Sequence, residues 1–172
     1  MDDSTRNLFQ HHADSPFHIS VGAVLVNNEG KILTHYRTVK TTPAQYLNTL
    51  GGLEDAYTLM RETIENGESI EGAVLRGLRE EFGAEGTIEK YLGSIRIPQL
   101  HAKTRTFEKT TLYFQVTFTK QNERPTDDGE SHTELIWETP EFLIERMREQ
   151  GRTANREDLD ESEIIEAYVT YR

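Results

Sequence analysis

The sequence predicts one α/β domain of the α+β type, in which helices flank a mixed β-sheet. Its 172 residues are long enough for one sizeable core and short for two. The composition, 35% hydrophobic and 28% charged, is typical of a globular protein. Strand-like segments lie on both sides of one strongly periodic helix, an order that indicates a sheet covered by helices in a single domain.

The first half of the chain begins with a predicted hairpin. Phe17–Val26 is short, apolar and β-branched, as buried strands are, and Lys31–Tyr36 is the returning strand after a turn at 27–30. Gln45–Leu50 is predicted as another short strand. The segment from Leu53 to Thr63 is ambiguous, and a helical turn is expected there.

The best-defined helix runs from Ile70 to Phe82. Its apolar residues recur at helical spacing, Ser69 is a suitable N-cap, and Gly83 suits the left-handed position after the last turn. Gly77 is unusual in a helix interior, where glycine costs about 1 kcal/mol relative to alanine.

The second half is predicted to add three strands and two helices, and Thr139 with Pro140 forms a helix start. The strands are expected at Thr87–Ile97, Lys109–Thr119 and Leu135–Trp137, and the helices at 139–149 and 161–168. We expect a single domain over 1–172, with an N-terminal arm at 1–16 and a C-terminal helical extension at 150–172.

Composition excludes several classes of function. The chain has no cysteine, which excludes disulfides, thiolate metal sites and cysteine nucleophiles, so any metal is held by oxygen or imidazole. Its formal net charge of −11 disfavours a large nucleic-acid interface. No apolar run approaches the roughly 20 residues that span a bilayer, and no secretory signal is recognisable, so a cytoplasmic location is expected.

The predicted helix carries a group of charged residues. Arg76 and Glu80 are one turn apart and share a face, whereas Glu81 lies nearer the apolar stripe and needs a compensating cation or hydrogen bonds. Taken alone, Arg76 and Glu80 are an ordinary surface pair that contributes about 0.2–0.5 kcal/mol. The spacing of Glu68 relative to this group favours a functional interpretation.

That spacing resembles the Nudix box, in which Gly, five residues, Glu and seven residues precede Arg-Glu-aliphatic-any-Glu-Glu-any-Gly-aliphatic. Glu68 and Arg76 fall in register, and so do the later members of the motif, Leu78, Glu80, Glu81 and Gly83. Ala84 is a small substitute for the last aliphatic residue. The resemblance covers the chain from about His18 to Arg148 and implies a Nudix-like fold.

Two positions depart from the pattern. Glu62 stands where the box has its first Gly, and the nearest Gly pair is Gly51–Gly52, a register that predicts an insertion from Leu53 to Glu62 within a loop. Gly77 stands where the box has the Glu after Arg76. In many members that carboxylate binds metal or activates water.

The resemblance implies an Mg²⁺- or Mn²⁺-dependent hydrolase of a nucleoside diphosphate linked to another moiety. Glu80 and Glu81 would hold the metal, and Glu81 is also counted among the catalytic residues. Arg76, partnered by Glu68, would orient the carboxylates. The implied partner is a small nucleotide-type diphosphate, and pairing into a homodimer is plausible by analogy with the family.

The missing carboxylate leaves the general base and the activity open. Glu130, in the acidic loop before Trp137, is the first candidate for the base, and Glu134 is the alternative, with His132 between them. Solvated turn residues are an equally good interpretation of each. A catalytically weak or inactive nucleotide-binding module is the alternative function. A cysteine-dependent isoprenoid diphosphate isomerase shares the fold, but the chain has no cysteine.

Overall fold

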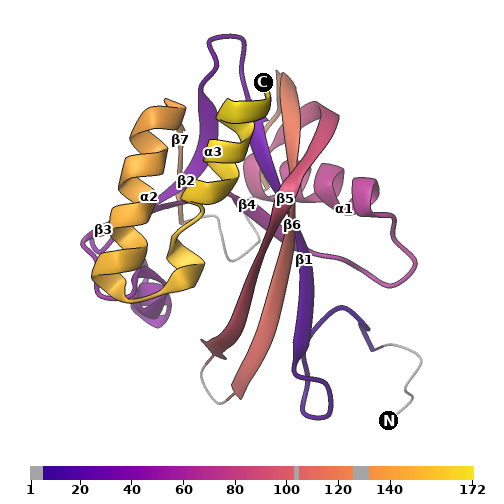
Figure 1. The fold of residues 1–172 in the computed structure, drawn as a ribbon, viewed down its shortest axis with the longest axis vertical. Helices are drawn as coiled ribbons and strands as arrows, with labels where there is room; N and C mark the ends of the chain where they lie inside the picture. The colour runs from indigo at the N-terminus through magenta and orange to yellow at the C-terminus, as the bar shows by residue number, and fades with distance from the viewer. Residues whose placement is uncertain (1–5, 103–104, 126–131) are drawn as a thin grey trace.

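The computed structural model describes residues 6–102, 105–125 and 132–172. Over these residues the chain forms one seven-stranded mixed sheet with helices on both faces, as Figure 1 shows. The strands are β1 (Phe17–Val26), β2 (Ile32–Thr38), β3 (Asp55–Thr58), β4 (Met60–Thr63), β5 (Ala84–Ala102), β6 (Arg105–Gln121) and β7 (Glu134–Glu138). The helices are α1 (Ile70–Gly77), α2 (Pro140–Ala154) and α3 (Ser162–Tyr171), with short helical segments η2 (Ala44–Leu50), η3 (Leu78–Phe82) and η4 (Glu157–Leu159).

The central strand β1 explains why the sheet is buried on both faces. It pairs with β6 in parallel along its length, and with β4 and β2 in antiparallel fashion. Val21 and Leu25 pack with α1, whereas Val24 packs with α2 and α3. A strand covered on both sides is expected to be continuously apolar, as this one is from residue 21 to 26.

The two helical layers lie on opposite sides of the sheet (Figure 1). On one side Val74, Leu78 and Phe82 are fully buried against β1 and β6. On the other side Leu143 of α2 and Ile165 of α3 are fully buried. The predicted fold class is therefore confirmed. None of the described helices is both long enough and apolar enough to cross a membrane.

Most predicted elements are confirmed, and the predictions that are wrong lie between residues 44 and 63. The predicted strand Gln45–Leu50 is wrong, because Ala44–Leu50 is a 3₁₀ helix that starts after Pro43 and ends at Gly51 in the left-handed conformation. The expected helical turn and loop at 53–63 are also wrong. Residues 55–58 pair with β2 and residues 60–63 pair with β1, so tertiary pairing makes them strands.

The predicted helix 70–82 changes character halfway. Ser69 caps α1 by accepting a hydrogen bond from the backbone N–H of Gly72 at 3.0 Å, as expected. From Leu78 the helix widens into a π-helical turn that ends at Gly83, whose φ is 61°. Such π turns are frequent at functional sites, and this one carries Glu80 and Glu81.

His18, at the start of β1, is expected to make folding sensitive to acid. Burial, followed by the positive charge of Lys109, lowers the pKa of His18 to about 4 from an ordinary 6.5. Because the folded protein favours the neutral ring, its contribution is complete above pH 6.5 and is lost as the pH falls towards 4. We expect the free energy of unfolding to fall by up to about 3 kcal/mol from this residue.

Urea unfolding at pH 7, 5.5 and 4.5 measures this dependence, with His18→Gln as the comparison. The glutamine variant keeps a polar side chain beside Thr63, whose hydroxyl lies 3.0 Å from His18 Nε2. Its stability should fall less steeply between pH 6.5 and 4.5 than that of the wild type. Parallel curves for the two proteins would contradict the assignment.

Candidate functional site

Arg76 organises the acidic side chains around α1. Its Nε and Nη2 donate to the two carboxylate oxygens of Glu68 at 2.9 and 3.0 Å, and Nη2 also donates to the carbonyl of Thr63 at 2.8 Å. Its Nη1 donates to Glu80 Oε2 at 3.1 Å and lies 3.3 Å from Glu62 Oε1. The structure thus brings together the predicted residues Glu68, Arg76 and Glu80, and it adds Glu62.

The hydrogen bonds of this group lower the pKa of Glu68, chiefly through the two bonds from Arg76. The pKa of Glu62 is raised by burial, and then by the negative charge of Glu81, while Arg76 opposes the rise. The negative charges of Glu62 and Glu81 therefore repel each other, and both residues lie on the same side of the sheet as α1.

Glu81 is held by a second set of contacts. Its side chain is 10% exposed, and its Oε2 accepts a hydrogen bond at 2.7 Å from Nε2 of His35, which is buried on β2. Because a carboxylate can only accept, the proton lies on Nε2, and Nδ1 accepts from the hydroxyl of Thr133 at 2.7 Å when the ring is neutral. Arg124 in turn donates to the hydroxyl and carbonyl of Thr133 at 2.9 and 2.7 Å.

This chain of contacts was not predicted from the sequence. His35 lies on β2, Thr133 immediately precedes β7, and Arg124 lies in the segment after β6, so only the fold brings them to Glu81. The one signal available was a histidine inside an apolar strand, which must find polar partners when it is buried.

Gly77 is explained by close packing between α1 and β4. A Cβ at this position would lie 2.7 Å from Met60 Sδ and 2.8 Å from Glu62 Cβ, both on β4. A side chain at position 77 would therefore collide with the strand. Close packing of the helix backbone against β4 therefore accounts for glycine at this position.

Gly77→Ala is consequently expected to destabilise the protein, although alanine is the better helix former. The helical gain is about 1 kcal/mol, whereas overpacking costs typically 1–3 kcal/mol. We expect a net loss of about 1 kcal/mol, measured by chemical unfolding. As a control, Gly72→Ala in the first turn of the same helix would meet only Ser69 Oγ at 3.0 Å and the flexible side chain of Glu68. A stabilised Gly77→Ala variant would contradict this account.

The donor set suits a hard divalent cation. Glu62, Glu80 and Glu81 offer carboxylate oxygens, which Mg²⁺ and Mn²⁺ prefer. Among the described residues no three His, Cys, Asp or Glu side chains are already gathered closely enough to hold a metal ion. Mg²⁺ does not require such a cage, because it commonly uses one or two carboxylates, water and substrate phosphate. The residues present therefore fit this type of ion.

Other predicted residues lie elsewhere. Glu130 falls outside the described residues. Glu134 is exposed on β7, and the His132 ring stacks on Tyr46 with ring centroids 5.1 Å apart. Trp137 packs edge-on against Phe118 beside the core on the α1 side.

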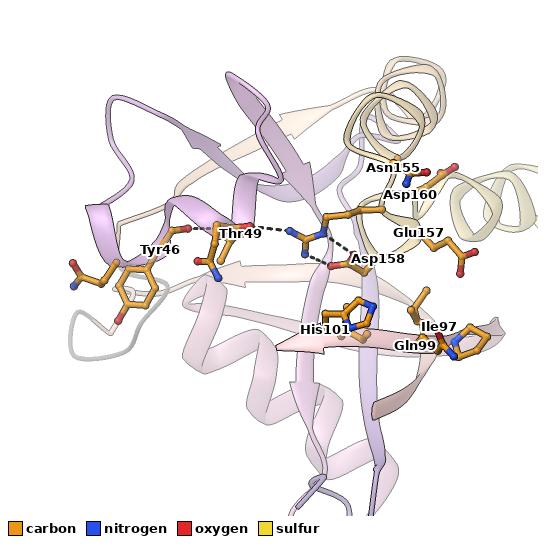
Figure 2. Close-up of a pocket in the computed structure, with 15 residues that line it drawn as sticks. Tyr46, Thr49, Ile97, Gln99, His101, Asn155, Glu157, Asp158 and Asp160 are labelled. Atoms are coloured by element: carbon orange, nitrogen blue, oxygen red, sulfur yellow. Dashed lines mark hydrogen bonds and ion pairs between the residues drawn. The ribbon is translucent and has the colours of Figure 1, made fainter. Parts of the chain in front are cut away.

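A large cleft lies on the opposite side of the sheet from α1. Its volume is about 1270 Å³, and Figure 2 shows Tyr46, His101, Asn155 and Asp158 around it. Arg156 spans part of it by donating to the carbonyl of Asn48 at 2.8 Å and to both carboxylate oxygens of Asp158. None of Glu62, Glu68, Arg76, Glu80 and Glu81 lines this cleft.

Strand β4 lies between the two regions. Met60 and Glu62 face α1, whereas Arg61 points the other way, towards Glu161 and the carbonyl of Asp158. Successive strand residues alternate between faces, so Arg61 and the acidic group occupy opposite faces of the same strand. Arg61 reaches towards the cleft only through its hydrogen bond to Asp158, which lines it.

Solved structures with similar folds cover nearly all of the chain. A solution structure of the E. coli ORF135 protein matches 88% of this chain and 89% of its own, at 20% identity and a TM-score of 0.56. A NUDIX hydrolase from Nitrosomonas europaea matches 88% of each chain, at 18% identity and a TM-score of 0.60. A MutT protein from Methanosarcina mazei Go1 matches 86% of this chain and 99% of its own, at 17% identity and a TM-score of 0.55.

Sequence comparison leads to the same family. No curated protein sequence matches the chain. The family model described as the NUDIX domain matches residues 16–159, which is most of the chain and includes the acidic group around Arg76. The chain therefore belongs to the Nudix family.

Proposed function

We propose that this protein hydrolyses a diphosphate bond in a nucleoside diphosphate linked to another moiety, with Mg²⁺ or Mn²⁺ as cofactor. The observation that carries the proposal is the arrangement around Arg76. One guanidinium binds Glu68 through two hydrogen bonds and holds Glu80 in place, immediately before the buried Glu81. Membership of the Nudix family supports a hydrolase of this type.

In this proposal water adds across one P–O–P bridge. Its oxygen forms a new bond to phosphorus, the bridging oxygen leaves with the other phosphate, and the proton passes to a carboxylate. A bound divalent cation would neutralise diphosphate charge and favour deprotonation of the attacking water. Glu80 and Glu81 would hold it, and positioning with charge stabilisation would dominate the reaction.

The protein residues contribute mainly orientation. Arg76 and Glu68 fix the position of Glu80, because two parallel hydrogen bonds define the plane of the guanidinium. His35 fixes the rotamer of Glu81, since both ring nitrogens are engaged. Glu130 remains the first candidate for the group that accepts the proton of water.

The proposal is tested by incubating the full chain with Mg²⁺ and a panel of nucleoside diphosphate derivatives, with phosphorus NMR of the products. We expect cleavage of at least one member, its loss with excess EDTA, and its return when Mg²⁺ or Mn²⁺ is added. Reaction in ¹⁸O-labelled water should place the label on a single phosphate, because one P–O bond forms per turnover.

A nucleotide-binding module without turnover is the second candidate, and the glycine at position 77 favours it. The same panel separates the two functions. If no compound is cleaved while one of them raises the melting temperature, the protein binds and does not hydrolyse. Product formation that survives EDTA would also contradict the metal-dependent proposal.

A further inference from the structure

The two departures from the box pattern are reciprocal, and the fold brings them into contact. The pattern has Gly at position 62 and Glu at position 77, and this chain has Glu62 and Gly77. The two residues are 15 positions apart on different elements, yet a Cβ on Gly77 would lie 2.8 Å from Glu62 Cβ. One side chain therefore occupies the space between β4 and α1, and it comes from the strand instead of the helix.

The carboxylate of Glu62 points to the acidic group. Its Oε1 accepts from the backbone N–H of Thr63 at 2.8 Å and lies 3.3 Å from Arg76 Nη1. That same nitrogen donates to Glu80 Oε2 at 3.1 Å, so the carboxylates of Glu62 and Glu80 are neighbours on one guanidinium edge. The Glu62 side chain is 21% exposed, which leaves it accessible to an ion from solvent.

The ion pair between Glu62 and Arg76 is shared with other acceptors of the same guanidinium. Arg76 already has two hydrogen bonds to Glu68, one to Glu80 and one to the carbonyl of Thr63. Arg76 therefore faces three carboxylates, those of Glu62, Glu68 and Glu80, with a single positive charge. Partly buried negative charge of this kind requires compensation, and a divalent cation supplies it.

We propose that Glu62 supplies from β4 the carboxylate that the box pattern places at position 77, and that it binds the divalent cation together with Glu80 and Glu81. The inference rests on the proposed metal-dependent function of this site. The inference explains both departures together. Gly77 leaves space for the Glu62 side chain, and Glu62 provides the carboxylate that the pattern has at position 77.

The test measures Mn²⁺ affinity of the full chain without substrate, from the electron paramagnetic resonance signal of free Mn²⁺. Glu62→Gln keeps the size of the side chain and removes its charge, and we expect the dissociation constant to rise about tenfold or more. Glu89→Gln, on an exposed part of β5, is the matched control and should bind as the wild type does.

The exchanged variant, Glu62→Gly with Gly77→Glu, provides the decisive comparison. It removes the Glu62 Cβ contact, and the other atoms closest to a Cβ at position 77 belong to the flexible thioether of Met60. We expect it to recover most of the Mn²⁺ affinity that Glu62→Gln loses. Gly77→Glu alone should melt at a lower temperature than the exchanged variant, because it retains both close contacts.

The outcomes separate this inference from the function it rests on. If Glu80→Gln and Glu81→Gln weaken Mn²⁺ binding while Glu62→Gln does not, the role of Glu62 is wrong and the metal site stands. A folded exchanged variant that binds no better than Glu62→Gln would also overturn the inference. If the wild type binds no Mn²⁺ and cleaves no substrate, the proposed function itself fails. Melting temperatures identify any variant that does not fold. If the exchanged variant does not fold, the Mn²⁺ affinity of Glu62→Gln alone decides whether Glu62 binds the metal.

Discussion

Glu81→Gln is expected to lower kcat/KM for a cleaved diphosphate by about 100-fold or more, because even the loss of a residue that only supports a metal ligand costs about 10–100-fold. The substitution keeps the size of the side chain and an oxygen that accepts from His35, whose Nε2 now lies 2.7 Å from Glu81 Oε2. It removes one negative charge from the proposed metal site. Steady-state assays over a range of Mg²⁺ concentrations measure the effect and should show a higher Mg²⁺ requirement.

Folding of this variant should be preserved. Glu81 is buried, and glutamine keeps both the size of the side chain and an acceptor for His35 Nε2, so the melting temperature should change little. Glu71→Gln, exposed in the first turn of α1, is the matched control and should change neither rate nor stability. An unaltered Mg²⁺ dependence in Glu81→Gln would remove Glu81 from the metal site.

The largest loss of stability is expected from Glu161→Ala, on the other side of the sheet. The carboxylate of Glu161 is 3% exposed, accepts from the backbone N–H of Leu59 at 2.7 Å, and accepts from the hydroxyl of Tyr113. It also lies 3.7 Å from Nε of Arg61. Burial, followed by the charge of Glu161, raises the pKa of Tyr113, which keeps its hydroxyl protonated and donating.

Removing this carboxylate takes the acceptor from the backbone N–H of Leu59, takes one partner from the Tyr113 hydroxyl, and removes the negative charge that faces the Arg61 cation. Breaking a buried pair in this way costs about 3–5 kcal/mol. Chemical unfolding of Glu161→Ala against the wild type measures the loss. Glu163 is exposed in the first turn of α3, which Glu161 precedes, and Glu163→Ala should change the free energy of unfolding by no more than about 0.5 kcal/mol. A loss from Glu161→Ala no larger than that of the control would show that water replaces the carboxylate.

Local signals were sufficient for much of this fold. The continuous apolar run in β1, the Ser69 cap and the Gly83 terminus of the box helix each reflect interactions within a few residues, and each was confirmed. The errors fell where long-range pairing decides. Residues 55–58 and 60–63 carry no strong strand pattern, and they are strands because β2 and β1 offer backbone partners.

The candidate site divides in the same way. The spacing of Glu68, Arg76, Glu80 and Glu81 lies within one helix and its entry, so their grouping could be predicted from helical geometry. The partners of Glu81 could not, because His35, Thr133 and Arg124 reach it from separate segments, at sequence separations that no local periodicity encodes.

The sequence by itself determined the fold class, the family pattern and the two positions where that pattern is broken. It presented Glu62 and Gly77 as separate departures, one interpreted as a sign of an insertion and the other as a missing carboxylate. Only the tertiary structure decided that they are neighbours, because antiparallel pairing with β1 places β4 under α1. Packing across that contact has room for one side chain, and β4 provides it.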